Sequence, residues 1–205
     1  MLTETPPHVT VFRTHHTRLQ RVRAKPVSLG PLDVTMITLR CTEKAARALG
    51  FARMEHVPAG TSPLGDWYVN LIATVDGGLF LFVNEQSLLA VLVPRQAMKS
   101  MDVFVARVGN ILSMIGLPND RIHEEVEHFR EARVGKTMSK RVIGVMNDLA
   151  ARCQERVEEA SPRSKVSISD FELRLATMPQ ATLGFRTAGE VAIELLESRA
   201  EFGAV

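Results

Sequence analysis

The sequence is poor in the residues that crosslink a chain or bind metals: its 205 residues include two cysteines and six histidines. Cys41 and Cys153 stand far apart, so they fit no metal-binding spacing, and two unpaired thiols are typical of a reducing cytosol. The longest apolar runs, 79–83 and 88–93, are separated by polar residues and fall short of the roughly 20 residues of a membrane helix. The N-terminus also lacks the apolar core of a secretory signal. We therefore expect a cytoplasmic protein with no membrane partner.

Established catalytic and nucleotide-binding motifs are missing as well. Gly135-Lys136-Thr137 resembles the end of a phosphate-binding loop, but Arg130 stands where that loop needs a glycine. We interpret this stretch as a solvated loop between helices. His123 and His128 are five residues apart, whereas a zinc helix needs a spacing of four to bring both rings to one metal ion. The sequence therefore predicts no metal and no cofactor.

The net charge of +2 is unevenly distributed. Residues 1–35 carry five basic side chains against two acidic ones, four prolines and no lasting periodicity. Such a segment buries too little apolar surface to offset the entropy lost on ordering. We predict a basic, disordered leader over 1–35, with Met36 as a candidate natural start, followed by a single domain over 36–205.

The pattern changes at Met36. Residues 36–41 alternate as a half-buried strand, Thr42 is placed to cap a helix ending at Leu49, and 51–65 has the prolines and glycines of a loop. Gly77 and Gly78 predict a tight turn between antiparallel strands 67–75 and 79–83. Residues 88–93 fit either a third antiparallel strand or a buried helical turn.

After Pro94 the period becomes helical. Apolar stripes predict helices over 98–115, from Asn119 onward and over 141–158, and Ser169-x-x-Glu172 and Thr187-x-x-Glu190 have the capping-box pattern of helix starts. The predicted fold is therefore α+β: a small, mainly antiparallel sheet, made of a hairpin or meander plus an N-terminal strand, with helices packed on one face.

Polar side chains set among apolar ones are the candidate ligand site. They lie on or beside the predicted strands and the third helix: Asp66, Trp67, Asn70, Asn84, Glu85, Asn147 and Asp148. Buried polar groups need partners, so this set is either a hydrogen-bonded scaffold or a pocket. Trp67, the single tryptophan, fits a core position better than a stacking platform.

Six blocks in order carry a family resemblance. They are Met36-Ile-x-Leu-Arg-Cys-Thr42, Leu64-Gly-Asp-Trp-Tyr-x-Asn70, Leu81-Phe-Val-Asn-Glu85, Val91-Leu-Val-Pro94, Val145-Met-Asn-Asp148 and Leu183-Gly-Phe185. Together, from about Met36 to Arg186, the chain resembles a bacterial family known as domain of unknown function 6933, some of whose members are associated with plasmid-borne reading frames. The resemblance implies a bacterial cytosolic α+β domain. It implies no activity, and the 35-residue leader departs from the family pattern.

Three functions remain open. The first is a non-enzymatic binding or regulatory domain, linked to mobile elements or defence, that acts through a protein or small-molecule partner. The second is an enzyme whose carboxylates and amides gather around Asp66, Asn70, Asn84, Glu85 and Asp148. The third is weak nucleic-acid association through the arginine-bearing leader and Arg133, Lys136, Lys140 and Arg141.

Overall fold

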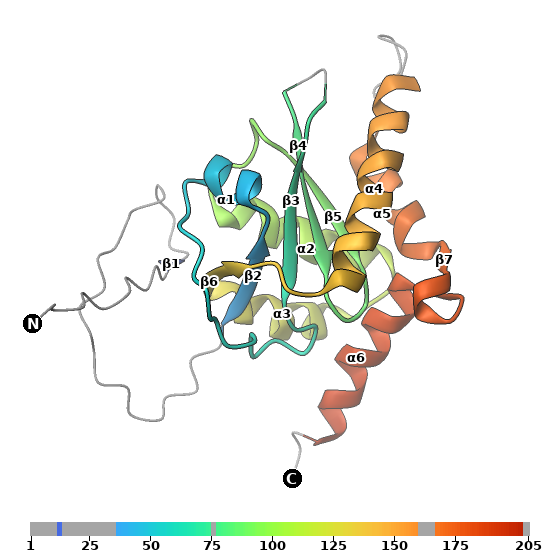
Figure 1. Ribbon diagram of the computed structural model, residues 1–205. Coiled ribbons are helices and arrows are strands. Elements are labelled where there is room, and N and C mark those ends of the chain that lie inside the picture. The colour runs from blue at the N-terminus through green and yellow to red at the C-terminus, as the bar shows by residue number, and fades with distance from the viewer. Residues whose placement is uncertain (1–11, 14–35, 75–76, 160–166, 203–205) are drawn as a thin grey trace, which may run out of the picture.

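A computed structural model describes residues 12–13, 36–74, 77–159 and 167–202. Its centre is a six-stranded sheet in the order β1-β6-β2-β3-β4-β5, with helices on both sides (Figure 1). The predicted leader over 1–35 lies outside the described residues except for Phe12–Arg13, which form the short strand β1.

The described domain begins with a strand–helix–strand unit. β2 (Ile37–Cys41) and α1 (Glu43–Leu49) confirm the predicted strand and helix, and the Thr42 side chain caps the helix. Gly50 ends α1 with a φ of 74°, a left-handed conformation that glycine adopts without strain. β3 (Trp67–Ile72) pairs with β2 in parallel, because the connection through α1 and the following loop returns the chain to the same end of the sheet.

A three-stranded antiparallel meander follows. Of the two alternatives predicted for residues 88–93, the structure has the strand and not the helical turn. β3 pairs with β4 (Leu79–Asn84), and β4 pairs with β5 (Ala90–Pro94). Gly77 and Gly78 have φ values of 102° and 107° in the connection between β3 and β4, which explains the glycine pair in the sequence.

The predicted fold class was wrong about the sheet, which is mixed and not mainly antiparallel. β6 (Glu131–Lys136) occupies the region that we interpreted as the end of the helix from Asn119 onward and a solvated loop. It pairs with β2 in parallel over the full length of β2. β2 therefore has parallel neighbours on both sides, while β1 adds an antiparallel pair at the outer edge of β6. Alternation of Ala132 and Val134 with polar residues marks β6 as a strand.

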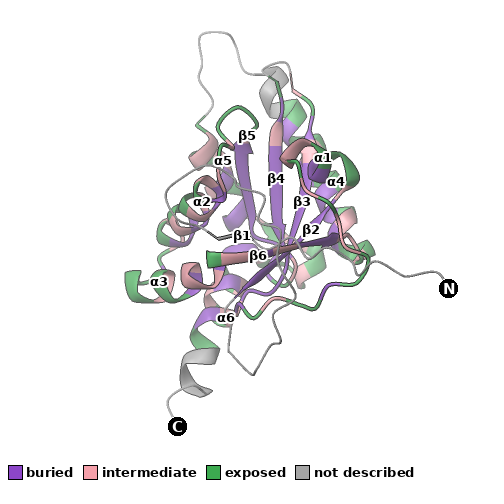
Figure 2. Ribbon diagram, turned by 90° about the vertical axis from the view of Figure 1, so that its left-hand side faces the viewer, coloured by how far each residue is buried: buried purple, intermediate pink, exposed green. Residues whose placement is uncertain are grey.

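The prediction that helices cover one face was also wrong. The first face is covered by α1, α2 (Met101–Met114), α3 (Asn119–Glu127) and α6 (Ala188–Phe202). The second face is covered by α4 (Lys140–Glu159). Figure 2 shows the strands of the sheet buried along most of their length. Both faces of the central strands are apolar, so each face needs a helical layer.

The two layers form two hydrophobic clusters. Trp67, fully buried, lies at the centre of the first, with its ring centroid 5.3 Å from that of Phe104 and 6.3 Å from that of Phe129. This confirms a core position for the tryptophan. Tyr68 and Leu81 belong to the second cluster, which also contains Met146 of α4.

The C-terminal third closes the outer edge of the sheet. α5 (Ile168–Thr177) packs against β5, and the hairpin formed by β7 (Pro179–Gln180) and β8 (Arg186–Thr187) connects it to α6. The Thr187–Glu190 capping box is confirmed, because each residue's amide donates to the side chain of the other. The one predicted at Ser169 is wrong, since Ser167 caps α5.

Within the described ranges, none of the helices combines the length and apolar content that a membrane crossing requires.

Candidate functional site

Asp66, which immediately precedes β3, is engaged in a buried ion pair. Its Oδ2 accepts from Arg40 Nε of β2 at 2.8 Å, and its Oδ1 accepts from the Gly60 amide at 2.7 Å. Arg40 also donates to the Val57 carbonyl at 3.2 Å. These contacts tie the loop after α1 to the sheet, and both carboxylate oxygens have protein partners.

Asn84, at the end of β4, organises the turn into β5. Its amide nitrogen donates to the Leu64 carbonyl at 2.8 Å, and its oxygen accepts from the amide and hydroxyl of Ser87 at 2.9 and 2.8 Å. The side chain is fully buried. With donors and acceptor both engaged, Asn84 holds two loops together.

Glu85 contacts Tyr68 near the start of α4, whereas Asn70 contacts Thr42 at the start of α1. Glu85 Oε1 accepts from the Tyr68 hydroxyl at 3.2 Å, and that hydroxyl accepts from the Ser139 amide just before α4. Burial is the main cause that raises the pKa of Tyr68. Asn70 accepts from the Thr42 hydroxyl at 3.2 Å, on the side where α1 begins.

The structure therefore brings together only part of the predicted set. Asp66, Asn84 and Glu85 are neighbours, since the Asp66 carbonyl accepts from the Glu85 amide at 2.9 Å and from the Asn84 side chain at 3.4 Å. Trp67 is packed within the first cluster, and Asn147 and Asp148 are exposed on α4. The described residues of the set do not converge on one pocket.

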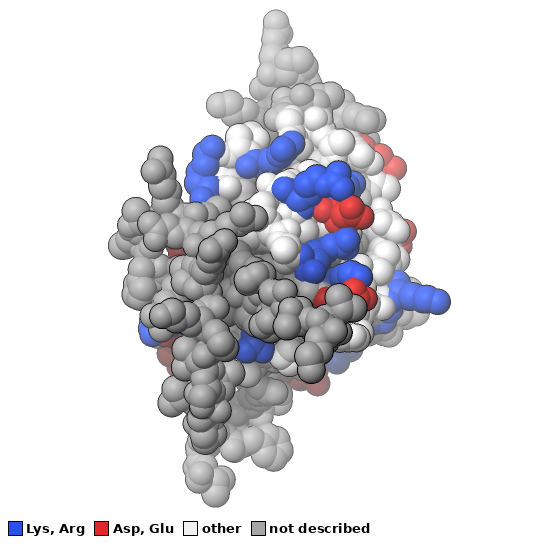
Figure 3. Space-filling view, turned by 60° about the vertical axis from the view of Figure 1, so that its left-hand side comes forward, with Lys and Arg blue, Asp and Glu red and all other residues white. Residues whose placement is uncertain are grey.

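Basic side chains gather on the side of the molecule that carries α1 and β6, with acidic side chains among them (Figure 3). Lys136, from the predicted nucleic-acid set, forms an ion pair with Glu55. Arg141 donates to the Glu85 carbonyl at 2.6 Å. Part of the positive charge in this set is therefore engaged within the protein.

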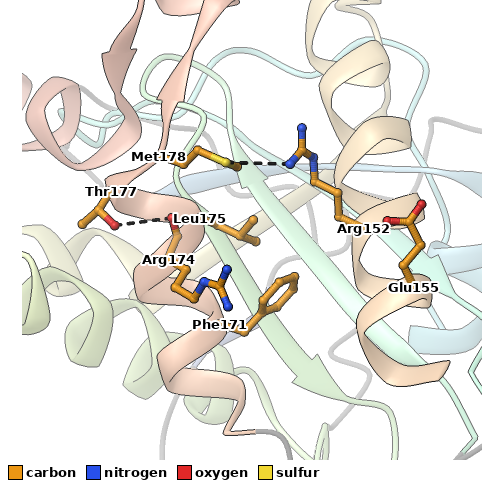
Figure 4. Close-up of a pocket in the computed structure, with 7 residues that line it drawn as sticks. All are labelled: Arg152, Glu155, Phe171, Arg174, Leu175, Thr177 and Met178. Atoms are coloured by element: carbon orange, nitrogen blue, oxygen red, sulfur yellow. Dashed lines mark hydrogen bonds between the residues drawn. The ribbon is translucent and has the colours of Figure 1, made fainter. Parts of the chain in front are cut away.

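A depression of about 420 Å³ lies between α4 and α5 (Figure 4). None of the residues that line it belonged to the predicted site: Arg152, Glu155, Phe171, Arg174, Leu175, Thr177 and Met178. Arg152 and Glu155 come from α4, one helical turn apart, and the others come from α5 and the residue that follows it.

Two arginines and one glutamate, Glu155, give the depression its charge. Arg152 contacts the sulfur of Met178 at 3.7 Å, and neither Arg152 nor Arg174 has an acidic partner among the described residues. Phe171 and Leu175 provide apolar surface between them, packed into the second cluster. A guanidinium presents a planar fork of donors to carboxylate or phosphate. The arrangement therefore suits an anionic group attached to an apolar one.

Glu172 fixes the position of α5. Its carboxylate, fully buried, accepts from the Leu92 amide of β5 at 2.6 Å and forms an ion pair with Arg107 of α2. Arg107 also donates to the Ser169 hydroxyl at 3.2 Å. α5 is thus attached to the sheet edge and to α2, so the wall of the depression that it forms is rigidly supported.

Sequence reasoning missed the depression because its two arginines lie on different helices. Neither Arg152 nor Arg174 departs from what an exposed helical position normally holds, and only the packing of α4 beside α5 brings them together. Within the described residues, no three His, Cys, Asp or Glu side chains are grouped so as to hold a metal ion.

Comparisons with known proteins identify a family for this chain but no individual relative. We found no match to this chain among curated proteins or among solved structures. Residues 38–189 match the family described as domain of unknown function 6933, which agrees with the six blocks quoted above. The match spans most of the chain, and the protein therefore belongs to that family.

Proposed function

We propose that this protein is a non-enzymatic binding module of the bacterial cytosol, and that it holds an anionic group of its ligand in the depression between α4 and α5. One observation carries the proposal: Arg152 and Arg174, without acidic partners among the described residues, lie at the same depression, whose base is apolar. An unpaired guanidinium beside a hollow is a ready partner for a carboxylate or phosphate.

The residues around the depression favour binding over catalysis. Its lining contains one carboxylate, Glu155, and one hydroxyl, Thr177, which donates to the Leu173 carbonyl at 2.9 Å. A nucleophile needs a base within hydrogen-bond reach, and this hydroxyl has a carbonyl there instead.

The predicted carboxylate and amide set supports a scaffold role better than an enzyme site. Asp66 and Asn84 are buried and hydrogen-bonded to other parts of the chain, while Asp148 is exposed on α4. Nucleic-acid association ranks below anion binding, because acidic side chains stand among the basic ones near α1 and β6.

The cysteines support a cytosolic location. Cys41 and Cys153 are both buried and unpaired with each other. Burial raises the pKa of each thiol to about 12, which suits packing and not redox chemistry.

The test is an NMR titration of the isotopically labelled protein with phenylacetate, using phenylacetamide as the uncharged probe of the same shape. We expect phenylacetate to shift resonances of the lining residues and phenylacetamide to shift them far less. Arg152→Glu and Arg174→Glu should each abolish the effect. Lys44→Glu, the same charge reversal at an exposed position of α1, should leave it unchanged.

Resonance shifts that are scattered over the surface, or that persist in both arginine variants, would contradict the proposal. Shifts centred on Asp66, Asn84 and Glu85 would instead return attention to the predicted polar set.

A further inference from the structure

The turn before β8 holds the side chain of Phe185 exposed to solvent. Its exposed fraction is 77%, and in the described part of the chain only Met138 joins it as a large apolar side chain exposed to solvent. Its φ is +66°, in the left-handed region that residues with a Cβ rarely occupy. Such a conformation is unfavourable relative to ordinary backbone for a residue with a Cβ.

The hairpin before α6 holds this conformation in place. The Phe185 amide donates to the Gln180 carbonyl at 2.9 Å, and the Gly184 amide donates to the Ala181 carbonyl at 3.1 Å. Leu183 points inward and packs against both hydrophobic clusters. The inward leucine anchors the loop, and the tight turn then directs the aromatic ring to solvent.

A strained and exposed aromatic residue is unfavourable for folding on two counts, so it is informative about function. Strained backbone conformations concentrate at functional sites and ligand clamps. Exposed aromatic side chains with few rotatable bonds are common energetic anchors of protein–protein interfaces. Because the turn is already ordered by its own hydrogen bonds, a partner that packs on Phe185 loses little entropy in ordering it.

In the chain, this hairpin begins directly after a residue that lines the depression. Met178 lines the depression, and Pro179 begins β7 immediately after it. α4, α5 and the hairpin lie on the same side of the molecule (Figure 1). Phe185 itself does not line the depression, so a ligand that contacts both must extend past Met178 and along the hairpin.

From this arrangement we propose that the ligand is an acidic segment of another protein, with carboxylates held by Arg152 and Arg174 and an apolar side chain packed on Phe185. The inference rests on the proposed function and specifies its ligand. Two arginines against the single carboxylate of Glu155 leave the depression an excess of positive charge, which selects acidic residues. The position of Phe185 beyond the depression selects an extended chain over a small metabolite.

The experiment is a selection of random displayed peptides on the full-length protein, followed by affinity measurements on the enriched sequences. We expect these peptides to combine Asp or Glu residues with a nearby apolar residue. Phe185→Asn should weaken their binding roughly tenfold or more, as for an interface hot spot. Met138→Ser is the matched control, because it removes the other exposed apolar side chain, and it should leave binding unchanged.

The Phe185→Asn variant also separates binding from folding. Asn tolerates the left-handed region better than Phe, so Phe185→Asn should unfold at the same temperature as the parent or at a higher one. A variant that binds less but is no less stable identifies Phe185 as an anchor. A variant that loses stability would overturn the inference, because the ring would then serve folding.

Other outcomes are distinguishable. If phenylacetate does not bind the depression, the proposed function fails. If it binds, but the enriched peptides lack acidic residues or bind Phe185→Asn as well as the parent, only the present inference fails. Sedimentation that shows a parent dimer and a monomeric Phe185→Asn variant would also overturn it, because a second copy of the chain would then cover Phe185.

Discussion

The carboxylate of Glu172 accepts a hydrogen bond from the backbone amide of Leu92 at 2.6 Å, across the outer edge of the sheet. β5 is the last strand in the strand order, so the outward amide of Leu92 has no neighbouring strand to receive it. An unpaired backbone donor at a sheet edge is costly when buried and invites pairing with other chains when exposed. Glu172 satisfies this donor and attaches α5 to the sheet at the same point.

The stability of the protein should depend on the ionisation of Glu172. Burial raises the pKa of this carboxyl from 4.5 to about 7, and the Leu92 amide and the Arg107 guanidinium only partly oppose the shift. The folded state therefore binds the proton more tightly than the unfolded state. The resulting stabilisation is fully present below pH 4.5 and is lost as the pH rises through about 7.

We expect the free energy of unfolding in urea to fall between pH 5 and pH 8, by an amount on the order of 3 kcal/mol at most. Glu172→Gln keeps an acceptor for the Leu92 amide but cannot ionise, so this variant should show a flatter pH dependence. An unchanged slope in the glutamine variant would assign the pH dependence to other groups.

Replacing Asn84 with alanine should destabilise the fold, because the amide nitrogen of Ser87 and the carbonyl of Leu64 would lose their buried partner. Unsatisfied buried polar groups cost about 1–3 kcal/mol each. Asp148→Ala, at an exposed position of α4, should change the free energy of unfolding by less than about 0.5 kcal/mol. Equal effects of the two substitutions in chemical denaturation would argue against a scaffold role for Asn84.

Sequence patterns predicted most elements of this fold but not how they are assembled. The strand predicted over 36–41, the helix ended by Gly50 and the hairpin of β3 and β4 were found from local periodicity and turn residues. The third strand of the meander was one of two predicted alternatives. Periodicity identifies which residues share a face, but it does not identify which strands are neighbours. The parallel pairing of β2 with β3 could have been inferred, because a strand, a helix and a second strand in succession are typical of a parallel crossover.

The sequence also contained a pattern that indicates the second helical layer. β4 is apolar at five consecutive positions, Leu79 to Val83, and a strand without polar alternation has no solvent-facing side. β6 was missed for the opposite reason, since Glu131, Arg133 and Lys136 give it the appearance of a solvated segment. In the folded protein Glu131 and Arg133 alternate with Ala132 and Val134, which are buried in the first cluster.

The candidate site had no comparable signal. Arg152 and Arg174 are separated by a helix end and a connection, and arginine on the exposed side of a helix is common. Phe185 was part of a quoted block, but neither its exposure nor its positive φ is encoded in a local pattern.

The two thiols should be unreactive in the folded state. Cys41 and Cys153 are 0% and 1% exposed, and burial raises the pKa of both to about 12, so little thiolate forms at pH 8. We expect labelling by a disulfide reagent to be slow and to accelerate with urea in step with unfolding. Rapid labelling of one cysteine under native conditions would indicate local opening around β2 or α4.

The buried pair of Arg40 and Asp66 should show strong coupling in a double-mutant cycle. Asp66→Asn keeps an acceptor for the Gly60 amide but leaves the Arg40 guanidinium buried without its carboxylate, so it should cost about 3–5 kcal/mol of unfolding free energy. Arg40→Met should be costly for the same reason, since Asp66 would then be a buried charge without a counterion. Combining Arg40→Met with Asp66→Asn removes both charges and keeps an acceptor for Gly60.

That double variant should therefore be more stable than the sum of its single changes predicts, by about 1 kcal/mol or more. Chemical denaturation of the four proteins measures the coupling directly. Additive effects would mean that the loop after α1 is held mainly by its backbone contacts, such as the Met54 amide bonded to the Val134 carbonyl at 2.9 Å, and not by the ion pair. Strong coupling would assign to Asp66, first proposed here as a candidate site residue, the structural task of fixing that loop on the sheet.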